Sequence, residues 1–141
     1  MSIYADTSFL VSIYLMDAHS READRLFKAS TGLLLTPLHS VELAHAIEQN
    51  IYRGRISSGT AVKIYFEFER DRRAGLWHEV AQPELTFKLS VDLARAHTAV
   101  IGNRTLDTLH VAAALELKAE RFWTFDERQA KLAKAAGLKL K

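Results

Sequence analysis

The sequence has 141 residues, of which 48% are hydrophobic and 26% charged, the balance of one ordinary globular domain. It contains no cysteine, which excludes a disulfide scaffold, a thiolate zinc site, an iron–sulfur cluster and a cysteine nucleophile. The net charge of +2 is small, although residues 118–141 carry seven Lys and Arg against three Asp and Glu. Such a segment fits either a polyanion partner or an ordinary solvated helix face.

The first residues lack the positively charged and apolar segments of a secretory signal. No apolar run approaches the roughly 20 residues that a membrane span needs. We therefore expect a cytoplasmic protein that has no contact with the membrane.

The first half of the chain alternates short apolar runs with amphipathic stretches. The runs at 2–5 and 33–36 predict strands, because each is too short for a helix. The other segments predict helices at 8–15, 20–29 and 38–52. In the third helix an apolar stripe with helical spacing predicts the buried face, which consists of Leu38, Val41, Ala44, Ile47 and Ile51.

The second half continues this alternation. A helix over 57–74 begins at a serine cap, Ser57 or Ser58, and ends at Gly75. Further along we expect a strand at 76–80, helices at 84–101 and 106–117, a strand at 121–125 and a helix at 127–135, and the apolar pattern at 138–140 is compatible with an edge strand. The aromatic side chains of the 57–74 helix fit either core packing or a protein interface; they are Tyr65, Phe66 and Phe68.

Strands that alternate with helices are typical of an α/β fold. We predict a three-layer α/β/α sandwich with a central, mostly parallel sheet, in a single domain spanning residues 1–141. In such folds, ligands bind beyond the carboxyl ends of the strands. The residues that follow the predicted strands are therefore the first candidates for a functional site.

Four carboxylates occupy such positions. Asp6 and Asp126 follow the first and last of the four main strands, and Glu42 and Asp107 lie in early turns of helices that begin at the same edge of a parallel sheet. Taken singly, the three aspartates fit helix caps and Glu42 fits a solvated side chain. If they converge, they predict a cation site, because packed carboxylates repel one another unless a cation neutralises them.

Oxygen ligands favour a hard cation, Mg²⁺ or Mn²⁺, which activates water for attack on phosphate esters. The histidines fit such a site poorly. His39 and His45 stand about 120° apart around their helix and cannot share one ion. His110 lies three residues after Asp107 in an apolar helix, so we expect it to be hydrogen-bonded in the core or behind the carboxylates.

Four segments, in this order, resemble the motifs of a known family. They are Tyr4–Ser8, Ser40–Leu43, Arg104–Leu115 and Thr124–Arg128. Asp-Thr-Ser is a common tripeptide, whereas the run Leu-Asp-Thr-Leu-His-Val-Ala-Ala-Ala and the Thr-Phe-Asp segment are more specific. With these motifs the chain resembles the PIN-domain family, and within it the VapC-type toxin ribonucleases of toxin–antitoxin pairs.

The resemblance implies a Mg²⁺- or Mn²⁺-dependent endoribonuclease that leaves 5′-phosphate and 3′-hydroxyl ends. The catalytic, metal-binding acids of the family match Asp6, Glu42, Asp107 and Asp126 in this sequence. The fourth acidic position is the most variable one in the family, which makes Asp126 the least conserved type of ligand.

The resemblance also assigns supporting roles. Hydroxyl positions beside the acids match Thr7 or Ser8 and, before the last acid, Thr124. Among the basic residues, Arg104 is the first candidate to guide the RNA backbone, because it lies three residues before Asp107. The alternative is that Arg104 is a surface arginine or a structural partner of a site carboxylate.

Three partners are implied in the same way: an RNA substrate, a cognate antitoxin protein and a second copy of the chain in a homodimer. On this view the aromatic helix at 57–74 would contribute either a homodimer seam or an antitoxin groove, if it is not simply part of the core.

Other functions remain to be distinguished. A catalytically inactive PIN-like module would bind RNA or protein without cutting. A haloacid-dehalogenase-type phosphatase needs a second Asp where Ser8 stands, and a phospho-receiver domain needs adjacent acids near the first strand and a lysine after a late strand, which this sequence lacks.

Overall fold

A four-stranded sheet forms the centre of the computed structural model, which describes residues 1–141. Its strands are β1 (Ile3–Ala5), β2 (Leu33–Leu35), β3 (Trp77–Glu79) and β4 (Arg121–Trp123). They lie in the order β3-β2-β1-β4, and every neighbouring pair is parallel. The predicted α/β class with a central parallel sheet is therefore confirmed.

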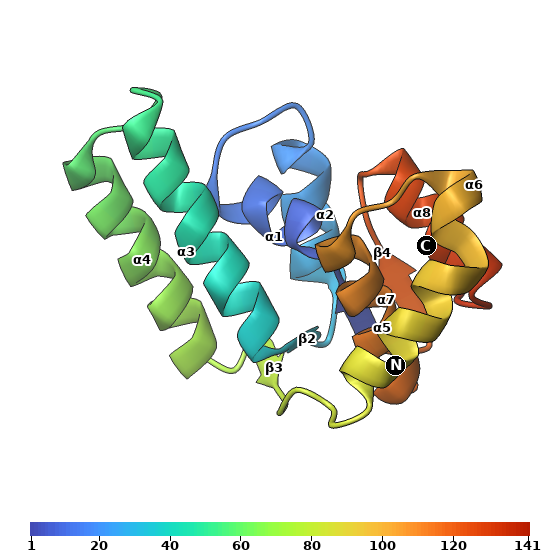
Figure 1. Ribbon diagram of the computed structural model, residues 1–141. Helices are drawn as coiled ribbons and strands as arrows, with labels where there is room; N and C mark the ends of the chain where they lie inside the picture. Colours follow the sequence, from blue (N-terminus) through green and yellow to red (C-terminus); the bar gives the residue numbers. More distant parts are fainter.

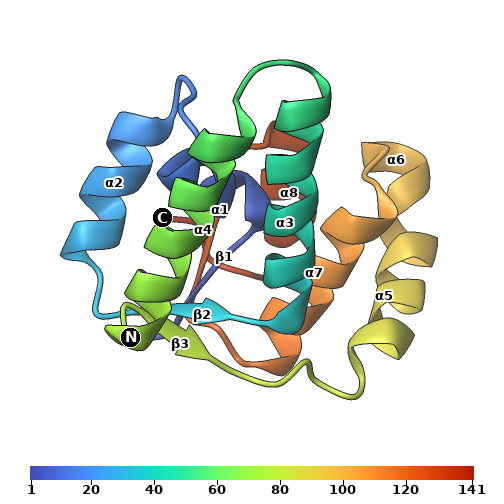
Figure 2. The same cartoon turned by 90° about the vertical axis from the view of Figure 1, so that its left-hand side faces the viewer.

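Helices cover both faces of the sheet (Figures 1 and 2). One layer consists of α1 (Thr7–Tyr14), α2 (Ser20–Ala29), α3 (Pro37–Tyr52) and α4 (Ser58–Arg73). The other contains α5 (Thr86–Leu93), α6 (Ala99–Ile101), α7 (Thr105–Glu116) and α8 (Glu127–Ala135). None of these helices has both the length and the apolar character that crossing a membrane requires.

Two hydrophobic cores follow from the alternation of side chains along the strands. Ile3 and Ala5 of β1 face the first layer and pack in the core that contains Phe9 of α1 and Ile47 of α3. Tyr4, between them, faces the second layer. Its core includes Phe122 of β4, Leu132 of α8 and the fully buried run Val111–Ala114 of α7. The apolar helix expected at 106–117 thus lies with most of its central residues buried.

The predicted apolar stripe of the third helix is partly wrong. Val41 is 67% exposed, and the buried residues of α3 are His39, Leu43 and Ile47, four positions apart. The helix is rotated in this way because His39 turns inward and hydrogen-bonds the carbonyl of Ala5 at the end of β1. The buried face of α3 therefore includes a polar side chain, which the spacing of apolar residues does not predict.

The predicted long helix at 84–101 is also interrupted. After α5, residues Ala94–Thr98 form a π-helical turn, η1, before the short α6 begins. A π turn inserts an extra residue without breaking the helical run, so apolar spacing alone does not reveal it. Gly102, with a left-handed φ of 72°, ends α6 and redirects the chain toward α7.

The carboxyl-terminal residues lie along the outer edge of β4. The carbonyl of Lys139 accepts a hydrogen bond from the amide of Phe122, and Phe122 and Leu140 form a parallel bridge. The apolar pattern at 138–140 thus yields a single bridge rather than a full strand. This segment covers the hydrogen-bonding groups of an otherwise open sheet edge.

Candidate active site

The predicted acids share one cavity, of about 230 Å³, beyond the carboxyl ends of β1 and β4. It is lined by Asp6, Thr7, Ser8, Val11, Glu42, Arg104, Asp107, His110 and Asp126. Because β1 and β4 are parallel neighbours, the first and last thirds of the chain meet here. The four carboxylates come from β1–α1, α3, α7 and β4–α8.

Asp6 lies at the centre of the sheet edge and is only 4% exposed. Its Oδ1 accepts hydrogen bonds from the amide of Phe9, which it caps at the start of α1, and from Ser8 Oγ at 2.5 Å. Its Oδ2 accepts one from Thr124 Oγ1 at 2.6 Å. Burial raises the pKa of Asp6 above its usual value, and the hydrogen bonds from Ser8 and Thr124 offset part of that effect.

Glu42 lines the same cavity from the second turn of α3. Its Oε1 accepts a hydrogen bond from Thr7 Oγ1 at 2.9 Å and is also paired with Nε2 of His110. Burial by itself would raise the pKa of Glu42, but the hydrogen bond and charge of His110, together with Thr7, lower it overall. Glu42 is therefore held as a carboxylate.

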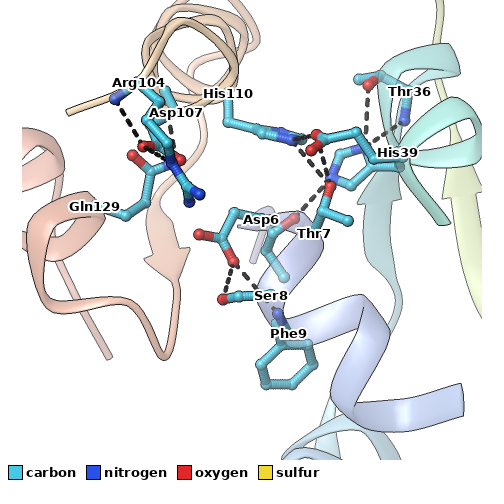
Figure 3. Close-up of polar contacts among 12 residues, drawn as sticks. Asp6, Thr7, Ser8, Phe9, Thr36, His39, Arg104, Asp107, His110 and Gln129 are labelled. Atoms are coloured by element: carbon cyan, nitrogen blue, oxygen red, sulfur yellow. Dashed lines mark hydrogen bonds and ion pairs between the residues drawn. The ribbon is translucent and has the colours of Figure 1, made fainter. Parts of the chain in front are cut away.

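His110 connects this carboxylate to the core. Its Nδ1 is 2.8 Å from the hydroxyl of Tyr4, and its Nε2 also lies 3.0 Å from Thr7 Oγ1. Both ring nitrogens are thus used inside the protein, where His110 is only 2% exposed (Figure 3). The expectation that His110 stands behind the carboxylates agrees with this arrangement.

His39 is fully buried, and both of its ring nitrogens form hydrogen bonds with backbone groups. The amide of Thr36 donates to Nδ1 at 3.0 Å, so Nε2 carries the proton that it donates to the carbonyl of Ala5 at 2.7 Å. Burial, with the nearby His110, lowers the pKa of His39 to about 3, which keeps the ring neutral. His39 therefore joins α3 to β1, and the expectation that it is no metal ligand is consistent with its position.

Asp107 occupies the first turn of α7 and is paired with Arg104. Its Oδ2 accepts hydrogen bonds from the backbone amide of Arg104 at 2.9 Å and from the guanidinium Nε at 3.3 Å. The hydrogen bond to Asp107, followed by the charges of Asp107, Asp126 and Glu42, raises the pKa of Arg104. Of the two readings of Arg104, the structure shows the partnership with a site carboxylate.

Asp126 caps α8, where its Oδ1 accepts a hydrogen bond from the amide of Gln129 at 2.9 Å. Its own amide donates to Thr124 Oγ1 at 3.0 Å. Thr124 thus connects Asp126 to Asp6. The side chain of Gln129 does not complete a capping box; its Nε2 donates to the carbonyl of Asp107 at 3.1 Å and ties α8 to α7.

One oxygen of three of these acids receives no hydrogen bond from the protein: Oε2 of Glu42, Oδ1 of Asp107 and Oδ2 of Asp126. The side chains as they stand form no group of three or more arranged to hold an ion. The donor set nevertheless fits a hard divalent cation, since four carboxylates line one small, polar cavity. Binding would require the free oxygens to turn toward one ion.

The cavity contains all the sequence-predicted site residues except Thr124, which reaches it through Asp6. Two relationships were not predicted. One is the pairing of His110 with Glu42, for which the only signal was the position of His110 one turn after Asp107. The other is that two roles given as alternatives for the aspartates occur together. Asp6 and Asp126 cap helices, Asp107 accepts a hydrogen bond from the amide of the capping residue Arg104, and all three line the cavity.

Comparison with known protein families gives a match over nearly the whole chain. The family model of the PIN domain matches residues 3–135. No curated protein matches the sequence closely enough to count as a relative.

Several solved structures share the fold. VapC20 of Mycobacterium tuberculosis, described as a sarcin–ricin loop cleaving toxin, is 17% identical, with a TM-score of 0.71 over 96% of this chain and 95% of that one. VapBC2 of Rickettsia felis, bound to a promoter DNA fragment, is 14% identical, with a TM-score of 0.68 over 100% of this chain and 98% of that one. FitAcB of Neisseria gonorrhoeae is 14% identical, with a TM-score of 0.67 over 98% and 95%.

Proposed function

Because the chain belongs to the PIN-domain family, we propose that it is a Mg²⁺- or Mn²⁺-dependent endoribonuclease, the toxin of a toxin–antitoxin pair. The observation that carries this proposal is the meeting of four carboxylates, far apart in sequence, in one cavity at the carboxyl edge of a parallel sheet. Three of them offer an oxygen that the protein does not use. The description of VapC20 as a sarcin–ricin loop cleaving toxin agrees with this assignment.

In this proposal Asp6, Glu42 and Asp107 would hold the cation, and Asp126 would orient the attacking water or a second cation. The cation supplies a more acidic water and stabilises the negative charge that develops on the phosphate. The water oxygen forms a bond to phosphorus as the bond from phosphorus to O3′ breaks. The water gives up a proton and O3′ gains one, which leaves a 5′-phosphate and a 3′-hydroxyl.

Hydroxyl groups fix the directions of these acids. Ser8 and Thr124 each hold one oxygen of Asp6, and Thr7 holds one oxygen of Glu42. Side chains that orient ligands in this way commonly account for 10–100-fold in metal affinity or activity. We assign Thr7, Ser8 and Thr124 this supporting role.

The partners in this proposal are cytoplasmic RNA, a cognate antitoxin and a second copy of the chain. VapBC2 and FitAcB are described by names that join two components, which fits an antitoxin partner for this chain. Two pairs of exposed apolar side chains suit protein contacts: Val62 and Phe66 on α4, and Phe87 and Val91 on α5. We assign the α4 pair, on a helix whose other residues help to line two surface hollows, to the antitoxin, and the α5 pair to the homodimer.

A cleavage assay tests the nuclease. A panel of labelled single-stranded RNAs is incubated with wild type, Asp6→Asn and the surface control Asp92→Asn, in Mg²⁺, in Mn²⁺ and in EDTA. We expect cutting by wild type and by Asp92→Asn, only with a divalent ion, and none by Asp6→Asn.

Two results would contradict the proposal. Equal cutting by all three proteins would indicate a contaminating nuclease. RNA binding without metal-dependent cutting, across structured and unstructured targets, would instead favour the catalytically inactive binding module.

A further inference from the structure

Arg104 stands out among the cavity residues because it is the only arginine or lysine among four carboxylates. It is anchored twice to the same oxygen of Asp107, by its backbone amide and by its guanidinium. The two partners differ in freedom: the Asp107 side chain is 13% exposed, and that of Arg104 is 69% exposed. The guanidinium can therefore leave while the carboxylate stays in place, still held by the backbone amide.

The guanidinium extends from Asp107 along the cavity that Arg104 helps to line (Figure 3), and most of the side chain remains exposed to solvent. Only its Nε is engaged by the protein, and the two terminal nitrogens have no protein acceptor. The negative charges of Asp126 and Glu42 also act on the guanidinium and help to raise the pKa of Arg104. A guanidinium cannot lose its proton in a protein, so its charge competes with any cation that enters the cavity.

Building on the proposed function, we propose that Arg104 is an exchangeable internal cation of the site. In the metal-free protein it neutralises part of the carboxylate charge; when a divalent ion binds, it leaves Asp107 and becomes available to an RNA phosphate. Planar guanidinium groups bind phosphate oxygens in pairs, which suits this second position. Metal and RNA would then favour each other's binding, because the ion releases the side chain that the RNA uses.

Mn²⁺ binding tests this inference without any need for catalysis. Electron paramagnetic resonance counts free Mn²⁺ during titration of metal-free wild type, Arg104→Gln and the control Arg95→Gln, an exposed arginine on η1. We expect Arg104→Gln to bind Mn²⁺ at least about fivefold more tightly than wild type, within the usual range of coupling between sites, and Arg95→Gln to match wild type. Arg104→Lys, which restores a positive charge, should return part of the way to wild type.

Thermal melting gives a second readout. Without metal, Arg104→Gln should melt below wild type, because the carboxylates lose their internal counter-charge. Saturating Mn²⁺ should raise the melting temperature of Arg104→Gln by more than it raises that of wild type. If Arg104 were only a brace for α7, the variant would melt lower by the same margin with and without metal, and Mn²⁺ affinity would not rise.

A single-stranded DNA oligonucleotide, used as a polyanion probe, tests the released position. Mn²⁺ should strengthen its binding to wild type more than its binding to Arg104→Gln. Wild type that binds Mn²⁺ while Arg104→Gln binds it equally or more weakly would overturn the inference alone. Wild type that binds no Mn²⁺ at all would overturn the inference together with the proposed metal site.

Discussion

Thr124 donates a hydrogen bond to Oδ2 of Asp6 over 2.6 Å, although 118 residues separate them in the sequence. The bond exists because β1 and β4 are parallel neighbours whose carboxyl ends meet. The same hydroxyl oxygen accepts the amide proton of Asp126. One threonine thus fixes the first and the last acids of the cavity relative to each other.

Replacing this threonine tests that connection. Thr124→Val keeps the shape but removes both hydrogen bonds, so we expect kcat/KM for RNA to fall by roughly 10–100-fold. Thr124→Ser retains the hydroxyl and should keep most of the activity. Steady-state cleavage, with circular dichroism to verify folding, measures the effect; equal rates for the valine and serine variants would contradict it.

The Asp6→Asn variant distinguishes a role of Asp6 in RNA cleavage from a role in protein stability. The pKa of Asp6 is raised by burial, so its charged form is costly in the metal-free protein. Asparagine removes that charge and keeps an oxygen for the amide of Phe9. We expect cleavage to be lost, while the melting temperature of the metal-free protein stays the same or rises; Asp107→Asn should behave alike. Melting lowered by several degrees with cleavage intact would show that these residues are caps only.

His39 makes stability depend on pH. Its pKa falls from 6.5 to about 3 on folding, so the unfolded chain binds a proton that the native state rejects. This contribution to stability is complete above about pH 6.5. Below it, the free energy of unfolding should decrease by up to about 1.4 kcal/mol per pH unit.

Urea denaturation between pH 7.5 and 4.5 measures this slope. His39→Gln should unfold more easily at neutral pH and show a flatter dependence than wild type. His45→Gln, at an exposed position of α3, is the matched control and should keep the wild-type slope. A variant at His39 with the full wild-type slope would assign the pH dependence to other groups.

A second buried network lies away from the acids. The hydroxyl of Tyr14 donates to Asp71 Oδ2 and accepts from Trp77 Nε1, each over 2.8 Å. Tyr14→Phe leaves both partners without that hydrogen bond and should cost about 1–3 kcal/mol in the free energy of unfolding. The rate of RNA cleavage by the folded variant should be unchanged. Tyr52→Phe, at a side chain that is 91% exposed, should affect neither quantity.

The two apolar surface pairs predict separable partners. Phe87→Ser should shift the chain toward monomer in sedimentation experiments and leave antitoxin binding intact. Phe66→Ser should weaken the antitoxin complex and leave self-association intact. The opposite pattern would exchange the assignments, and no change in either variant would exclude both surfaces.

Most of the fold can be predicted from the apolar runs of the sequence. Short runs at the four strands and helical spacing between them predict the element order, and α2 and α8 have their predicted bounds. The errors arise where hydrophobicity is not the deciding force. His39 turns α3 through a hydrogen bond, and a π turn interrupts the helix after Leu93.

The sequence predicts which residues line the cavity but not how their side chains are oriented. Carboxylates after parallel strands must meet at one edge, so Asp6 and Asp126 can be placed from topology alone. The direction in which each carboxylate points depends on contacts across the whole chain, such as Glu42 with His110 and Asp107 with Arg104. Spacing within one helix does not contain that information.

Asp6, Asp107 and Asp126 each bind backbone amides at the start of a helix. Those helix starts carry partial positive charge, which stabilises the carboxylates without any ion. We therefore expect the chain to reach its native fold without a metal ion. Under the proposed function, we expect that a folded but inactive pool of the protein can accumulate, and that the onset of activity follows the binding of ions and the release of inhibitors rather than synthesis or refolding.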